Sequence, residues 1–202
     1  MAALTLQSDH LRALLLVAAE SKNDPRRHLY GAHFHAGPRG VIGMATNGCY
    51  MLVVWCSAIP APDGYWFAPG CWKAPKGGTV ELANAGEGES LAASLAHPGG
   101  ALTWRAADSS VTRSTRLENW ECTVPRTVSG EPAAFNPDFL GTLNKAAGIL
   151  GHRNGPRIKS NGTGPALVAF DHPFVFGVIM PMRAELIDEP PEWFAPRMSV
   201  AA

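Results

Sequence analysis

Two histidines near the start of the chain, with a third shortly before them, are the side chains that could begin a metal site. His33 and His35 alternate along one predicted strand and so share a face, and His28 lies shortly before them. The sequence offers no third ligand at metal-site spacing and no partner to orient the imidazoles. Histidines on strands are more often hydrogen-bonded or exposed, so we expect no metal ion here. An enzyme that uses these histidines is the least favoured of three possible functions.

The acidic residues also lack the pattern of a catalytic site. The seven aspartates stand mostly at predicted caps and turns, where their side chains bond to nearby backbone amides. The sequence contains no nucleophile elbow, no P-loop and no dinucleotide-binding glycine pattern. We therefore expect a protein that is not an enzyme and needs no cofactor.

Composition points to a globular chain with little net charge. The 202 residues are 46% hydrophobic and 17% charged, and 17 basic residues balance 17 acidic ones. This length predicts one domain or two, and the charge balance argues against a strongly basic nucleic-acid-binding protein. The N-terminus has no basic segment, and the apolar run 14–19 is too short to cross a bilayer, so a cytoplasmic location without membrane contact is expected. The four cysteines form no C-x-x-C pair and are expected as small buried side chains.

Two segments have the periodicity of helices. The first begins at Ser8, a good N-cap residue, and should end near Pro25. The second is expected between Asn136 as the N-cap and Gly151 as the C-terminal cap, with Pro137 at the first helical position.

Short strands surround both helices. Strands are predicted at 3–6, 29–35 and 40–55, the last broken by a turn at Asn47-Gly48, and again at 133–135, 157–159, 166–170 and 174–180. Each end of the chain therefore has the order strand, helix and three strands. We predict a first unit at 1–57, a strand-rich insert at 58–130, a second unit at 131–183 and a tail rich in proline and aromatic residues at 184–202. Within the insert, the Ala-, Gly- and Ser-rich stretch 83–100 is predicted as a flexible loop.

Two short strings carry a resemblance to a known family. They are Ala45-Thr46-Asn47-Gly48-Cys49-Tyr50-Met51-Leu52 and Val178-Ile179-Met180-Pro181-Met182-Arg183. They resemble the Ala-Thr-Asp-Gly-His-Arg-Leu-Ala string and the Met-Pro-Met-Arg ending of the bacterial DNA polymerase III β sliding clamp. Asn47, Cys49 and Tyr50 depart from that pattern, and the chain is too short for the three-domain clamp, so it looks like a compact relative of the kind that phage genomes carry.

The resemblance implies an α+β sliding-clamp fold, in which antiparallel sheets carry two helices on one face. It also implies that the two strings converge on a hydrophobic pocket that binds short peptides of polymerases and clamp loaders. The residues that would line this pocket are Thr46, Gly48, Tyr50, Met51, Val178, Ile179, Met180, Pro181, Met182 and Arg183. Methionine suits such a pocket because its side chain repacks around different partners, although core filling at a strand end is an equally good explanation for Met180 and Met182.

In that family the helices line a ring around double-stranded DNA. The basic residues on or after the two predicted helices are the candidates for non-specific phosphate contact, namely Arg12, Lys22, Arg26, Arg27, Lys145, Arg153, Arg157 and Lys159. Ordinary solvated helix ends explain the same residues.

The leading interpretation is a processivity clamp for DNA replication, built as a homo-oligomeric ring with a polymerase or another clamp-binding protein as partner. A ring of six domain units would need six subunits with one unit each or three subunits with two. The alternative is an interaction module that binds replication proteins or a host clamp without encircling DNA. The aromatic pair Trp193-Phe194 could fold back over the pocket or anchor another surface.

Overall fold

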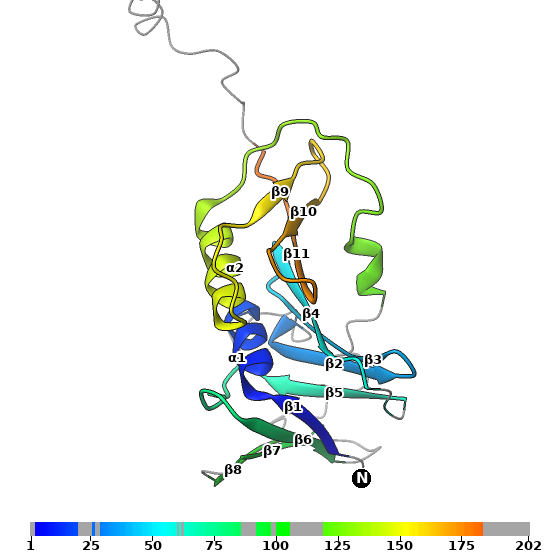
Figure 1. Ribbon diagram of the computed structural model, residues 1–202, viewed down its shortest axis with the longest axis vertical. Coiled ribbons are helices and arrows are strands. Elements are labelled where there is room, and N and C mark those ends of the chain that lie inside the picture. Colours follow the sequence, from blue (N-terminus) through cyan, green and yellow to red (C-terminus); the bar gives the residue numbers. More distant parts are fainter. Residues whose placement is uncertain are drawn as a thin grey trace, which may run out of the picture.

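The computed structural model describes residues 3–19, 26, 29–59, 61, 63–85, 92–97, 100–105 and 119–183. Its strands form two antiparallel sheets (Figure 1). The larger sheet has the order β5-β2-β3-β4-β11-β10-β9. Its strands are β2 (Gly31–Gly37), β3 (Gly40–Thr46), β4 (Tyr50–Ser57), β5 (Gly64–Pro69), β9 (Arg157–Lys159), β10 (Ala166–Ala169) and β11 (Val175–Ile179). The smaller sheet, of order β1-β6-β7-β8, contains β1 (Ala3–Gln7), β6 (Thr79–Ala85), β7 (Ala92–His97) and β8 (Gly100–Arg105).

Helices α1 (Ser8–Val17) and α2 (Pro137–Ile149) lie side by side on one face of the larger sheet (Figure 1). Leu11, Leu14 and Val17 of α1 and Leu143 of α2 are fully buried in the core that these helices form with the strands. Burial of an apolar stripe, rather than intrinsic helix propensity, stabilises helices of this length. The predicted α+β fold, with two helices on one face of antiparallel strands, is confirmed.

The elements predicted at the two ends of the chain are present in the predicted order. Asn136 caps α2 as expected, because its side-chain oxygen accepts a hydrogen bond from the Asp138 amide at 2.9 Å, and Gly151 follows the helix with a φ of +90°. Before α2, the predicted strand is reduced to a single bridge between Ala134 and Met182.

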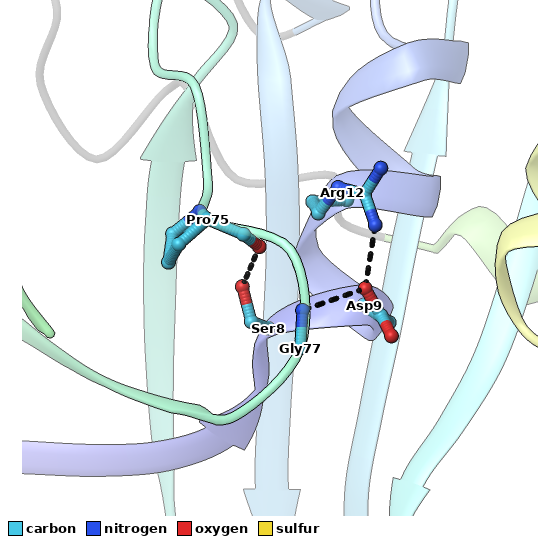
Figure 2. Close-up of polar contacts among 5 residues, drawn as sticks. All are labelled: Ser8, Asp9, Arg12, Pro75 and Gly77. Carbon is cyan, nitrogen blue, oxygen red and sulfur yellow. Dashed lines mark hydrogen bonds and ion pairs between the residues drawn. The ribbon is translucent and has the colours of Figure 1, made fainter. Parts of the chain in front are cut away.

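The start of α1 differs from the prediction. Ser8 is the first residue of the helix and caps no amide; its hydroxyl donates to the Pro75 carbonyl in the loop between β5 and β6 (Figure 2). Asp9 accepts from the Gly77 amide at 3.3 Å and from Arg12 at 2.6 Å (Figure 2). The first turn of α1 is therefore tied to a loop almost 70 residues away, and this long-range contact replaces a local cap. The predicted end of the helix near Pro25 lies outside the described residues; α1 itself ends at Val17.

The strands between residues 58 and 130 are divided between the two sheets. Strand β5 pairs with β2 in the larger sheet, and β6 pairs with β1 in the smaller one. The predicted flexible loop at 83–100 is wrong where it covers the end of β6 and where it covers β7, which pairs with β6 and β8 on its two sides. Pairing with two neighbours overrides the low strand propensity of alanine. The division of the chain into four segments stays a prediction.

Candidate functional site

The two strings of the resemblance lie next to each other at the centre of the larger sheet. Strands β4 and β11 pair antiparallel, with Val178 opposite Met51 and Ile179 opposite Tyr50. The Met180 amide extends this ladder by donating to the Cys49 carbonyl at 2.8 Å. Residues about 130 positions apart in the sequence thus become direct neighbours, and the pairing joins strands from the two ends of the chain.

The turn before β4 is held by its own side chains. The Thr46 hydroxyl donates to the Tyr50 carbonyl at 2.6 Å and accepts from the Gly48 amide at 3.0 Å. The Asn47 side-chain oxygen accepts from the amides of Cys49 at 2.9 Å and Tyr50 at 3.1 Å. An aspartate carboxylate could accept the same two bonds, which explains physically why asparagine can replace the aspartate of the family string.

Gly48 fits this turn for two reasons. Its φ of +91° is one that side-chain-bearing residues rarely adopt. The space that a side chain would fill is already taken by the guanidinium group of Arg26. Arg26, which was predicted to contact DNA, therefore lies against the turn of the candidate site.

Alternation along the strands divides the predicted pocket residues between the two faces of the sheet. Met51, Val53 and Val178 lie on the face opposite the helices, together with Met44 and Thr46 of β3. Met44, Met51, Val53 and Val178 form a buried cluster with Trp120, which we call the outer patch. Trp120 comes from the short 3-10 helix η3 (Trp120–Thr123), in the segment that runs along this side of the sheet (Figure 1).

Two of the predicted pocket residues lie on the helix side instead. The Tyr50 ring packs on Phe139 of α2, with ring centroids 5.0 Å apart, and Ile179 is fully buried in the main core. Direct contact between these two side chains and a peptide on the outer face would run against the alternation of the strands. Their place in a pocket stays a prediction.

The end of the second string continues from the outer patch to the surface. Met180 and Met182 are 44% and 49% exposed, and Arg183 is exposed beside them. Pro181 is half-buried between the two methionines. The Met182 amide donates to the Ala134 carbonyl at 2.8 Å, so this rim is attached to the segment before α2. Exposed methionines beside a buried apolar cluster are suited to binding an apolar peptide.

The candidate DNA contacts are spread over several elements. Arg12 on α1 forms an ion pair with Asp9, and this hydrogen bond lowers the pKa of the Asp9 carboxyl. Lys145 is exposed on α2, Arg153 is exposed after that helix, and Arg157 and Lys159 are exposed on the edge strand β9. Lys22 and Arg27 lie outside the described residues. A role in DNA binding for any of these residues stays a prediction.

The histidine face has a structural explanation. His33 is fully buried and its Nδ1 forms a hydrogen bond with the Tyr65 hydroxyl, while its ring lies 5.1 Å from that of Phe67. The His35 ring packs edge-on against Tyr65 at 4.9 Å. Within the described ranges, no three His, Cys, Asp or Glu side chains are grouped closely enough to hold a metal ion. His28 lies outside those ranges.

The expectation that all four cysteines are buried is wrong. Cys49, Cys71 and Cys122 are exposed, because each lies in a turn, a loop or the short η3 helix rather than inside a strand. Cys56, in β4, is half-buried, and burial raises the pKa of its thiol to about 12.

Sequence reasoning gave little weight to Trp120. The tripeptide Glu118-Asn119-Trp120 resembles a turn of the clamp family only weakly, and Trp120 follows no strand or helix periodicity. Its position on the sheet depends on the path of the whole connecting segment.

Solved structures of bacterial DNA polymerase III β subunits have the same fold. The subunit from Thermotoga maritima matches with a TM-score of 0.61 at 10% identity, over 91% of this chain and 66% of its own. The subunit from Borrelia burgdorferi, in complex with a natural product, gives 0.64 at 10% identity over 92% of this chain and 64% of its own. The DnaN sliding clamp from Pseudomonas aeruginosa, bound to griselimycin, gives 0.58 at 14% identity over 91% and 66%.

These likenesses define the fold class. No family model and no curated protein matches the sequence. The chain has the sliding-clamp fold that the two strings predicted, and it spans just under two thirds of the length of the three clamps described above. Among the described residues, no helix is both long and apolar enough to cross a membrane.

Proposed function

We propose that this protein is a compact sliding-clamp-like accessory factor of DNA replication. It acts without catalysing a reaction, and it recruits replication proteins through short apolar peptides that bind at Thr46–Met51 and Val178–Arg183. The observation that supports this most directly is the β4–β11 pairing, which places the two strings side by side and leaves Met180 and Met182 exposed at their junction.

The chemistry of the junction favours an extended apolar peptide. Burying about 200 Å² of apolar peptide surface is worth roughly 5 kcal/mol before the entropy of binding is subtracted. From this burial alone the net affinity should be weak, roughly in the millimolar range, because a micromolar complex needs about 8 kcal/mol. We expect the exposed Arg183 to bind a carboxylate or carbonyl group of such a peptide.

Peptide binding is tested with a labelled peptide that carries glutamine followed by leucine and phenylalanine. Met182→Ala should weaken its binding several-fold, because it removes an exposed apolar side chain from the junction. Ile59→Ala is the matched control, since Ile59 is also apolar and even more exposed, at 76%, but lies beyond the other end of β4. Equal affinity of the wild type and Met182→Ala would contradict this location of the site.

We also propose that copies of the chain assemble into a ring around double-stranded DNA in the cytoplasm. The sliding-clamp fold with α1 and α2 on one face supports this, since the resemblance implies that the helices face the duplex. Light-scattering mass at micromolar concentration tests the assembly: a trimer or hexamer is expected, and a strict monomer would rule out a ring made of this chain alone.

Two observations favour the narrower alternative, a module that binds replication proteins or a host clamp without encircling DNA. The formal net charge is zero, and the Arg12 charge on α1 is paired with Asp9. Both weaken electrostatic attraction to phosphate. Binding to a DNA duplex should fall steeply between about 50 and 200 mM salt for a clamp, and Lys145→Ala with Arg153→Ala should flatten that slope. Absence of binding at 50 mM salt would leave the interaction module.

A further inference from the structure

The outer patch combines sheet residues with one side chain from outside the sheet. Its strands contribute Met44, Met51, Val53 and Val178, each of them 5% exposed or less. The connecting segment contributes Trp120, which is 9% exposed, with Val124 beside it. Met51 and Val178 belong to the predicted peptide pocket, so Trp120 shares one buried cluster with residues that a bound peptide was predicted to contact.

Trp120 is attached to the sheet by apolar packing. The hydrogen bonds of residues 119–124 that the structure describes are all local to that segment. The Cys122 amide donates to the Asn119 carbonyl at 3.0 Å, the Val124 amide to the Glu121 carbonyl at 3.2 Å, and the Thr123 hydroxyl to the Trp120 carbonyl at 2.7 Å. Displacement of the short helix from the sheet would therefore break none of these bonds.

The rest of the connecting segment is anchored differently. The Gly130 amide donates to the Ser160 carbonyl at 3.1 Å, and the Met182 amide donates to the Ala134 carbonyl at 2.8 Å. Displacement of η3 would thus leave the second half of the segment, and the start of α2, in place.

The exposed rim and the outer patch are continuous. Met180 follows Val178 by two residues on the same strand direction, so their side chains lie on one face about 7 Å apart along the chain. A peptide side chain resting on Met180 and Met182 is therefore one strand step from the space that the Trp120 indole fills.

We infer that Trp120 occupies the aromatic subsite of the peptide-binding surface and is displaced when a partner peptide inserts its own aromatic side chain. This inference rests on the proposed peptide-binding function. It assigns the partner an extended peptide with a phenylalanine-sized or larger aromatic residue, because the vacated space is shaped by an indole and lined by adaptable methionines. Competition with Trp120 lowers the apparent affinity by the fraction of molecules in which the subsite is open.

Methionine oxidation reports the covering of the patch without any peptide. After limited exposure to peroxide, mass spectrometry of the wild type should show Met180 and Met182 oxidised much faster than Met44 and Met51, which are 0% and 5% exposed. In Trp120→Ala, the rate at Met51 should approach that at Met182. Trp55→Ala is the matched control, because Trp55 belongs to the same sheet, is 42% exposed and lies outside the outer patch. Protection of Met51 that persists in folded Trp120→Ala would overturn the inference.

Peptide affinity completes the test. The peptide with glutamine, leucine and phenylalanine should bind Trp120→Ala at least about tenfold more tightly than the wild type, if the closed form exceeds 90% of the molecules. It should also restore protection of Met51, and Trp55→Ala should change neither quantity. If the peptide binds both proteins but binds Trp120→Ala no more tightly than the wild type, the displacement of Trp120 is overturned and the peptide site stands. No binding to either folded protein would overturn the peptide-binding function and this inference with it. If Trp120→Ala does not fold, Trp120→Leu, which keeps part of the apolar volume, should give the same directions with smaller changes.

Discussion

Replacing Thr46 with valine removes a hydroxyl from the turn of the candidate site and leaves the shape of the side chain nearly unchanged. In the native protein this hydroxyl, on a residue only 7% exposed, donates to the Tyr50 carbonyl and accepts from the Gly48 amide. After the change, the Tyr50 carbonyl keeps one partner, the Asn47 amide at 3.3 Å, whereas the Gly48 amide loses its described acceptor. A buried hydrogen bond contributes about 0.5–1.5 kcal/mol net.

We therefore expect Thr46→Val to lower the free energy of unfolding by about 1–2 kcal/mol, the low end of two lost bonds, because Gly48 is exposed and water replaces part of the loss. For a chain of this size, that corresponds to a fall in Tm of roughly 2–8 °C. Peptide binding should weaken as well, since the turn holds Met51 in place. Urea denaturation and calorimetry measure the first effect, and titration with the labelled peptide measures the second.

Two further variants isolate the hydroxyl. Thr46→Ser keeps both hydrogen bonds and should leave hydrogen exchange at the Gly48 amide at the wild-type rate, whereas Thr46→Val should accelerate it. Thr5→Val makes the same change at an exposed position of β1 and should alter the stability by less than about 0.5 kcal/mol. The reasoning would be refuted if Thr46→Val were no less stable than Thr5→Val.

Four more predictions follow from particular contacts. The hydrogen bond from Arg12 lowers the pKa of Asp9 below its ordinary value of 3.8, so the stabilisation is complete above about pH 5 and is lost on further acidification. Asp9→Asn should remove this contribution, which stays below about 0.5 kcal/mol for so exposed a pair. Equal acid sensitivity of the two proteins in urea titrations at pH 3 and pH 6 would contradict this. Leu143→Ala, at a fully buried position packed near Gly177, should cost about 2–5 kcal/mol in urea denaturation, and a loss below 1 kcal/mol would show that the helix–sheet contact is looser than described. Removing residues 184–202, which lie outside the described residues, should tighten peptide binding in calorimetric titrations if Trp193-Phe194 compete for the site, whereas weaker binding would mean that the tail adds contacts. A thiol reagent at pH 8 should label the exposed Cys49, Cys71 and Cys122 within minutes. It should leave Cys56 unlabelled in the folded protein, because burial raises the pKa of its thiol to about 12. Fast labelling of all four cysteines would contradict this.

Local features of the sequence determined the elements at both ends of the chain. The Asn136-Pro137 start and the Gly151 end of α2 depend on side chains and backbone preferences within a few residues, so they could be predicted without the fold. The turn at Asn47-Gly48 is of the same kind, because Thr46 and Asn47 accept hydrogen bonds from amides two or three residues away. The two strings also carried the resemblance that predicted the sliding-clamp fold.

Tertiary structure decided the features that depend on distant partners. Ser8 was predicted to cap α1, but its hydroxyl donates a hydrogen bond to the distant Pro75 carbonyl instead. The alanine-rich segment at 92–97 becomes a strand because β6 and β8 supply its hydrogen bonds. The sequence predicted Met51, Val178 and Ile179 as neighbours in one pocket. The register between β4 and β11 decides which of them share a face of the sheet. Trp120 gained its place on the outer patch only through the path of the connecting segment, since apolar packing is non-directional and leaves no periodic signal in a short irregular stretch.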